Sequence, residues 1–238
     1  MLVDEIREAA NEIRFLLDPQ SARAVAQWAC LHVGPDPHAT EAGSCYRTRS
    51  LYFDTDDFAV LHQRGSYARS KYRVRQYGPG ETAFLERKLK KNGAVSKRRS
   101  IVRMEDLSHL ESPAPERGWG GYWFHRRILA RQLRPVCQIS YLRMARVTQT
   151  SCGPLRLTLD RELRAHRTDS LRFAFDRNEK TFALSERQPI LELKYRQEMP
   201  PLFAGLIAEF GLTTKTVSKY RLAAAALDFP SAMAAQVA

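Results

Sequence analysis

The stretch Ser70-Lys71-Tyr72-Arg73-Val74-Arg75-Gln76-Tyr77 alternates cationic residues with apolar or aromatic ones. Side chains two residues apart on a β-strand point to the same face of the sheet. The alternation therefore predicts a strand with one packed face and one cationic face. The packed face is expected to carry Tyr72 and Val74, and the cationic face Lys71, Arg73 and Arg75.

Two further strands are expected directly after this stretch, over Thr82–Lys91 and 95–102. Asn92-Gly93 between them is the strongest short hairpin signal, and Gly78-Pro79-Gly80 supplies the preceding turn. The segments form an antiparallel meander. Other strands are expected at residues 11–17, 49–54, 135–150, 155–160 and 189–196, with a further pair within 164–185.

Helices are expected outside the strands. Asp18 as N-cap and Pro19 at the first helical position open one through about His32. Shorter helices are expected at 55–63, 122–133, 200–210 before Gly211, and 218–228. No segment has the composition of a linker, so residues 1–238 are interpreted as a single domain of α+β class, mainly β. Its core is expected at about 11–228, with a frayed tail at 229–238.

The chain carries 38 Lys and Arg against 26 Asp and Glu, a net charge of +12. This balance favours polyanionic partners. The cysteines and histidines have no metal-ligand spacing, so a zinc site is not expected. The longest apolar stretch, residues 222–227, is too short to cross a bilayer. The acidic start of the chain has no apolar signal segment, and a cytoplasmic location is expected.

The same alternation on the other strands predicts charged faces that are overwhelmingly cationic. A solvated sheet face would also alternate, but it would mix the two signs of charge. An acid-x-base triplet recurs three times, in Glu12-Ile13-Arg14, Glu86-Arg87-Lys88 and Glu192-Leu193-Lys194. Carboxylates among cations suit Mg²⁺ or Mn²⁺, which bind protein oxygens together with substrate phosphates. The pattern predicts a face that binds a polyanion.

Several of these motifs, in this order along the chain, resemble the VTC domain, the polyphosphate polymerase domain of the triphosphate tunnel metalloenzyme (CYTH-like) superfamily. The resemblance spans about 11–221. It rests on Arg49-Ser50-Leu51-Tyr52-Phe53-Asp54-Thr55, Lys71-Tyr72-Arg73-Val74-Arg75-Gln76-Tyr77, Phe84-Leu85-Glu86-Arg87-Lys88, Lys97-Arg98-Arg99, Tyr141-Leu142-Arg143, Arg156-Leu157-Thr158-Leu159-Asp160, Leu191-Glu192-Leu193-Lys194 and Ser218-Lys219-Tyr220.

The resemblance implies a closed eight-stranded antiparallel β-barrel, a tunnel with its charged faces inward and its helices packed outside. It implies roles in catalysis for Arg73, Arg75, Lys88, Arg143, Lys194 and Lys219. Phosphate binding is implied for Arg14, Lys71, Lys97, Arg99, Tyr141, Arg156 and Ser218. Glu192 is the implied ligand of Mn²⁺ or Mg²⁺, with Glu86 and Glu12 as further candidates. Arg14 stands where the family commonly has Lys, a fork in place of a point charge.

The leading hypothesis is a polyphosphate polymerase that transfers the γ-phosphate of ATP to a polyphosphate chain. The acceptor phosphate is already anionic, so no His-Asp or Cys-His pair is needed. Three alternatives stay open: a hydrolase of tripolyphosphate or of a nucleoside or thiamine triphosphate, a non-catalytic polyphosphate-binding module, and a nucleic-acid binder. Nucleic acid is not the expected partner, because the bases alternate onto one sheet face instead of forming exposed patches with stacking aromatics. A membrane partner stays open.

Overall fold

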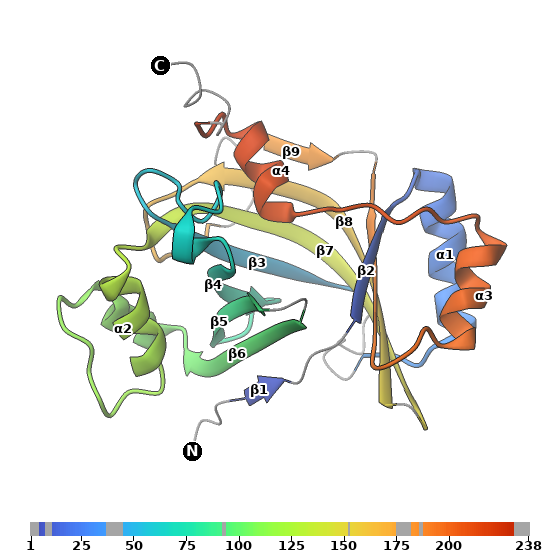
Figure 1. Ribbon diagram of the computed structural model, residues 1–238, viewed down its shortest axis with the longest axis horizontal. Coiled ribbons are helices and arrows are strands. Elements are labelled where there is room, and N and C mark those ends of the chain that lie inside the picture. The colour runs from blue at the N-terminus through green and yellow to red at the C-terminus, as the bar shows by residue number, and fades with distance from the viewer. Residues whose placement is uncertain are drawn as a thin grey trace.

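One antiparallel sheet forms the centre of the protein (Figure 1). The computed structural model describes residues 5–7, 11–36, 45–91, 94–151, 153–174, 182–185 and 188–230. The strands within these ranges are β1 (Glu5–Arg7), β2 (Asn11–Leu16), β3 (Cys45–Asp54), β4 (Ser70–Tyr77), β5 (Thr82–Lys91), β6 (Ala94–Arg103), β7 (Arg134–Thr150), β8 (Gly153–Arg167), β9 (Phe182–Ser185) and β10 (Ile190–Tyr195). The helices are α1 (Pro19–His32), α2 (Tyr122–Ala130), α3 (Pro201–Glu209), α4 (Lys219–Ala226) and two short 3-10 helices, η1 (Gly65–Tyr67) and η2 (Glu105–Glu111).

The predicted meander is confirmed. β4 pairs with β5, and β5 pairs with β6 from Thr82↔Arg103 to Lys91↔Ala94. The Asn92-Gly93 turn itself lies outside the described residues, but its flanking residues pair as a hairpin requires. Tyr72 and Val74 are buried in the core. Asp18 caps α1 by accepting the backbone N–H groups of Gln20 and Ser21, as its position predicts.

The expectation of a closed eight-stranded barrel is wrong in strand number and in closure. The described strands number ten, and their order is β1-β6-β5-β4-β3-β7-β8-β10-β2, with β9 on β8. β1 and β2 follow each other in sequence but pair with β6 and β10, at opposite edges of the sheet. No ladder between the described residues joins the two edges. The sheet is bent nevertheless, because Lys88 on β5 reaches Glu12 on β2 at 3.0 Å.

One face of the bent sheet, called here the inner face, carries Lys71, Arg73 and Arg75. Register extends it across the sheet through directly opposed residues. Arg73 lies opposite Tyr52, Tyr52 opposite Cys137, and Arg143, further along β7, opposite Asp160. Thr158 lies opposite Glu192, and Glu192 opposite Arg14. Glu86 of β5 lies opposite Arg73 and also opposite Arg99 of β6, so side chains from eight strands share one concave face.

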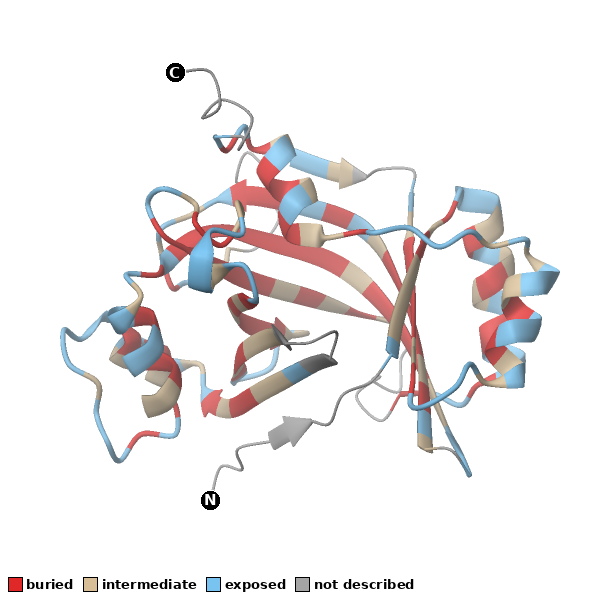
Figure 2. Ribbon diagram, viewed as in Figure 1, coloured by how far each residue is buried: buried red, intermediate tan, exposed pale blue. Residues whose placement is uncertain are grey.

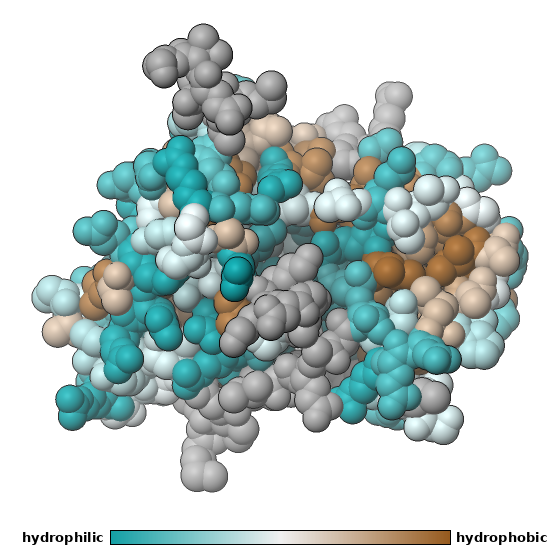
Figure 3. Space-filling model, in the orientation of Figure 1, coloured by the Kyte–Doolittle hydropathy of each residue, from teal (hydrophilic) through white to brown (hydrophobic). Residues whose placement is uncertain are grey.

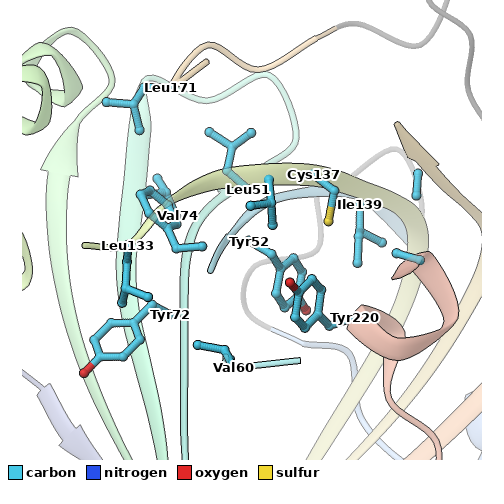
Figure 4. Close-up of a cluster of buried hydrophobic side chains, with 14 of the residues drawn as sticks. Leu51, Tyr52, Val60, Tyr72, Val74, Leu133, Cys137, Ile139, Leu171 and Tyr220 are labelled. Atoms are coloured by element: carbon cyan, nitrogen blue, oxygen red, sulfur yellow. The ribbon is translucent and has the colours of Figure 1, made fainter. Parts of the chain in front are cut away.

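Helices were expected on the outside, and α4 departs from this. Tyr220 of α4 stacks on Tyr52 of the inner face, with ring centroids 5.3 Å apart and planes 3° apart (Figure 4). At this end the inner face is apolar, with Cys137, Ile139 and Ile190 fully buried. α4 covers these side chains, so it removes from water an inner surface that an outer helix could not reach.

The expected helix at 55–63 is absent from the structure, which forms hydrogen-bonded turns there. Phe58 and Gln63 have φ values of 56° and 57°, left-handed conformations that a helix does not accommodate. The Asp54 carboxylate accepts the backbone N–H groups of Val60 and Leu61, at 2.7 and 2.9 Å. The buried carboxylate therefore replaces the helical hydrogen bonds.

The core has two parts, which appear in Figure 2 as buried segments on both sides of the sheet. The larger surrounds β3, β4, β7, α2 and α4, and the smaller packs α1 and α3 on the outer face of β8 and β10. Apolar surface stays exposed where α1 and α3 lie, in an otherwise mostly hydrophilic view (Figure 3). Phe229, expected in the frayed tail, is buried and packs on Phe58. Residues 231–238 lie outside the described residues.

None of the helices in the described part of the chain is both long enough and apolar enough to cross a membrane.

Candidate phosphate-binding site

The inner face and the first turn of α4 gather a large excess of positive charge. Among the described side chains, the inner face together with Lys219 carries eleven cations against five carboxylates, an excess of six for a chain with a net charge of +12. The cations are Arg14, Lys71, Arg73, Arg75, Lys88, Lys97, Arg99, Arg143, Arg156, Lys194 and Lys219. The carboxylates are Glu12, Asp36, Glu86, Asp160 and Glu192.

The Glu86 cluster consists of Glu86 and the three cations that contact it from neighbouring strands. Arg73 Nε donates to Glu86 Oε2 at 2.6 Å, and Arg99 Nε to Oε1 at 2.8 Å. Lys97 also contacts Oε1. Burial opposes ionisation of Glu86, but Arg73 and Lys97 hold its pKa well below its usual range. The carboxylate is 1% exposed and both of its oxygens are engaged, so it holds the three cations in place.

The Glu192 cluster joins two carboxylates through shared cations from β2, β5 and β10. Arg14 Nε lies 2.8 Å from Glu192 Oε2, and Arg14 also contacts Glu12. Lys194 Nζ lies 2.8 Å from Glu192 and 3.5 Å from Glu12, and Lys88 Nζ lies 3.0 Å from Glu12. Despite burial, Lys194 and Arg14 hold the pKa of Glu192 well below its usual range. The shared cations therefore bring the Glu192 and Glu12 carboxylates close together.

Asp160 is a member of the site that sequence reasoning missed. Its two oxygens accept from Arg143 Nε and Nη2, both at 2.7 Å, and Lys219 Nζ lies 2.7 Å from Oδ2. Burial opposes its ionisation, yet Arg143 and Lys219 lower its pKa to about 2. The signal was present, since Asp160 follows Arg156 and Thr158 at the same two-residue spacing. Asp36, which lies 2.8 Å from Arg156, follows a loop and had no such signal.

Two cations of the inner face have no carboxylate partner among the described residues. Lys71 Nζ donates to Ser218 Oγ at 3.0 Å, and Arg75 Nε donates to Ser50 Oγ at 2.9 Å. Burial lowers the pKa of Lys71 to about 8 and that of Lys88 to about 7, with Arg14 among the cations that add to both shifts. An anion that entered the site would relieve this repulsion and restore the ordinary pKa values.

Three hydroxyl groups of the inner face are buried without a hydrogen-bond partner in the described structure: Thr48 Oγ1, Tyr141 Oη and Thr158 Oγ1. A buried polar group without a partner is costly, and in native proteins it commonly marks the place of a water or ligand. The Tyr141 ring lies 5.1 Å from Lys219 Nζ and 5.2 Å from the Arg143 guanidinium carbon. Thr158 is the register partner of Glu192. These hydroxyls can donate to phosphate oxygens beside the cations.

All sixteen residues predicted for the site lie on the inner face or in the first turn of α4, as the side-chain contacts above describe. These residues differ in what their side chains contact. Arg156 lies beside Asp36 and Tyr46, Glu86 is enclosed by cations, and Ser218 caps α4 by accepting the N–H of Arg221.

The residues present fit a metal ion only if a substrate shares in its coordination. Within the described ranges, no group of three or more His, Cys, Asp or Glu side chains could hold a metal ion. Mg²⁺ and Mn²⁺ are commonly held by one or two carboxylates together with substrate phosphates. Glu192 and Glu12 suit this arrangement, because Lys194 contacts both and Glu192 lies opposite the Thr158 hydroxyl, which has no partner in the described structure. Glu86 suits it less, because three cations surround its oxygens.

The fold and the inner face together define a polyanion-binding domain built on a bent antiparallel sheet. The VTC domain family matches residues 9–228, and the chain belongs to this family. The resemblance found in the sequence motifs is thereby confirmed, and membership supports a domain that binds and processes triphosphates.

Solved structures with this fold share little sequence with the chain. A proposed adenylate cyclase from Bacillus halodurans superposes with a TM-score of 0.55 at 15% identity, over 89% of this chain and 94% of the other. A proposed adenylyl cyclase from Hippeastrum, described as having a dominant triphosphatase activity, gives a TM-score of 0.49 at 15% identity, over 96% and 98%. The first of these likenesses shows the fold alone. No curated protein sequence matches the chain.

Proposed function

We propose that the protein is a metal-dependent polyphosphate polymerase that uses ATP and adds its γ-phosphate to an inorganic polyphosphate chain. The observation that carries the proposal is the inner face itself. Among its described side chains, cations outnumber carboxylates by six, and three hydroxyls that have no partner there can donate to phosphate oxygens. A linear polyphosphate supplies many anionic oxygens along one line, which matches an inner face that carries charged side chains from seven strands. Membership of the VTC family supports the same assignment.

Transfer in this scheme requires positioning and charge neutralisation. A terminal phosphate oxygen of the chain attacks the γ-phosphorus of ATP, the bond from that phosphorus to the β–γ bridging oxygen breaks, and ADP leaves. Lys71 and Arg75, which lack carboxylate partners, would bind phosphate oxygens first. Arg73, Arg99 and Lys97 would add charge from the frame that Glu86 holds. Arg143 and Lys194 would contact the transferring group from the opposite strands, and Lys219 would contact it from α4.

Triphosphate tunnel enzymes are generally dependent on a divalent metal. Glu192, with Glu12 beside it, would hold Mn²⁺ or Mg²⁺, which when bound neutralises charge on the transferring oxygens. Arg14, Lys88 and Lys194 now neutralise these two carboxylates. They would shift their contacts toward phosphate as a metal-bound substrate enters.

Hydrolysis of tripolyphosphate or a nucleoside triphosphate is a second candidate. Water as the acceptor needs a group that orients it, and Glu12 can supply one. Glu12 is 14% exposed and linked to Glu192 by Arg14 and Lys194, so it could accept a proton from water. The two candidates differ in product: long chains for the polymerase and free phosphate for the hydrolase.

The test is Glu192→Gln, with Glu209→Gln, an exposed residue of α3, as matched control. The variant is expected to bind metal-free tripolyphosphate as tightly as the native protein or more so, because a repelling carboxylate is gone. Turnover of ATP with Mn²⁺ should fall at least about a hundredfold. Affinity is measured by calorimetry, chain length on a gel, and phosphate in parallel. Full activity in Glu192→Gln would place the metal elsewhere. If the native protein releases free phosphate and forms no polyphosphate chains, the hydrolase is favoured. If it does not turn over ATP at all, a non-catalytic binding module is favoured.

A further inference from the structure

The first turn of α4 supplies two groups to the site from outside the sheet. Ser218 Oγ accepts from Lys71 Nζ at 3.0 Å, and Lys219 Nζ lies 2.7 Å from Asp160. The preceding residues 212–218 have no regular structure. They cross β2 through two hydrogen bonds, from Lys215 N to Arg14 O at 2.8 Å and from Arg14 Nη1 to Val217 O at 2.7 Å. The position of α4 therefore depends on what its own side chains contact.

Tyr220 attaches α4 to the end of β3. Its hydroxyl donates to Asp54 Oδ2 at 2.6 Å, and both residues are buried. The Asp54 carboxylate is itself fixed, because it accepts the backbone N–H groups of Thr55, Val60 and Leu61 at 2.7–2.9 Å. Burial and the Asp54 carboxylate raise the pKa of Tyr220 far above its usual value. The phenol therefore keeps its proton and always donates.

The same tyrosine reaches a phosphate-site arginine through its neighbour. Its ring lies parallel to that of Tyr52 (Figure 4), and Tyr52 Oη accepts from Arg73 Nη1 at 3.2 Å. Arg73 is one of the three cations of the Glu86 cluster. One buried stack thus lies between α4 and the strand that carries Arg73.

We propose that Tyr220 and Asp54 are positioning residues that hold the first turn of α4 so that Lys219 and Ser218 face the bound triphosphate. The inference rests on the proposed function for the identity of the ligand only. Neither residue touches the phosphate. Each acts through Lys219, because Lys219 directly precedes the anchored Tyr220 in α4 and its ammonium group lies beside Asp160.

The test is a double-mutant cycle of Tyr220→Phe and Lys219→Ala, with metal-free tripolyphosphate as the probe and calorimetry as the measurement. Tyr220→Phe keeps the ring and its stack and removes the hydrogen bond, so the variant is expected to fold. It should weaken binding about fivefold to tenfold. In the Lys219→Ala background the same change should weaken binding by less than about twofold, because the group it positions is absent. Tyr72→Phe, a buried tyrosine of the opposite face, is the matched control and should bind as the native protein does.

Hydrogen exchange of the α4 amides provides a readout that needs no ligand. The Leu222 N–H is bonded to Ser218 O at 3.0 Å. It should exchange faster in Tyr220→Phe than in the native protein, and at the native rate in Tyr72→Phe. Unchanged exchange in Tyr220→Phe would overturn the anchoring. If exchange is faster but the two substitutions weaken binding independently, so that their fold-losses multiply in the double mutant, Tyr220 does not act through Lys219. A native protein that shows the exchange effect but does not bind tripolyphosphate would overturn the proposed function instead.

Discussion

The Glu86 cluster and the Glu192 cluster use the same residue types in opposite ways. In the first, one carboxylate that is 1% exposed holds three cations from β4 and β6. In the second, two carboxylates share cations from β2, β5 and β10, and Lys88 and Lys194 are 36% and 38% exposed. The first is therefore a closed frame that presents positive charge. The second is more open, because its two lysines reach solvent and Glu12 is 14% exposed.

Under the proposed function, the difference implies that a carboxylate among cations is not by itself a candidate metal ligand. What matters is how many cations already occupy its oxygens and whether a second carboxylate is close. Glu86 and Glu192 belong to the same sequence pattern, acid-x-base on a strand. Their surroundings separate them, since Glu12 accompanies Glu192 while cations surround Glu86.

The largest expected effect that separates the clusters is on stability. Glu86→Gln leaves Arg73, Lys97 and Arg99 without a carboxylate contact among the described residues, and removing one partner of a buried ion pair costs about 3–5 kcal/mol. Glu192→Gln should cost less, because Glu12 stays beside Arg14 and Lys194. Urea unfolding of both variants measures the difference. Equal losses of free energy would show that the two clusters are not distinct in this way.

Ligand binding should partly compensate for the lost charge in the first cluster. Tripolyphosphate at a hundredfold excess over its dissociation constant is expected to add about 2.7 kcal/mol to the free energy of unfolding. The gain should be larger at low salt, where repulsion among the inner-face cations is less screened. It should also persist in Glu86→Gln. Thermal unfolding with and without ligand measures it, with duplex DNA as control. Equal stabilisation by DNA, with none by tripolyphosphate, would contradict an inner-face site.

A smaller effect concerns pH, through Lys71, which contacts Ser218 and belongs to neither cluster. Burial lowers its pKa to about 8, so it loses its proton as the pH rises through 8. Phosphate favours the protonated form, so affinity should fall between pH 7 and 9, by up to about tenfold from this group, and binding near pH 8 should take up a proton. Calorimetry in buffers of different ionisation enthalpy measures both. Lys71→Arg, which stays charged, should flatten the dependence. An unchanged slope in that variant would assign the titration to another group.

Sequence alone determined those features that depend on near neighbours. The alternation in Ser70–Tyr77 predicted which side chains lie on the inner face, because a strand's two-residue period is a local property. Asn92-Gly93 predicted the hairpin register, and Asp18 the start of α1, since turn and cap chemistry involve only a few adjacent residues. The roles predicted for the site residues rest on the resemblance to the VTC domain, and the two-residue period agrees with it for those residues that lie on strands.

Only the tertiary structure decided which of these side chains meet. The pairing of β1 and β2 with opposite edges left the sheet open, and the bend that brings Lys88 to Glu12 joins strands 76 residues apart. The docking of α4 on the inner face, the hydrogen bond from Tyr220 to Asp54 and the enclosure of Glu86 likewise depend on contacts between different segments. Local periodicity specifies the face a side chain occupies. The partner across that face depends on sheet curvature and long-range register, which no short stretch of sequence contains.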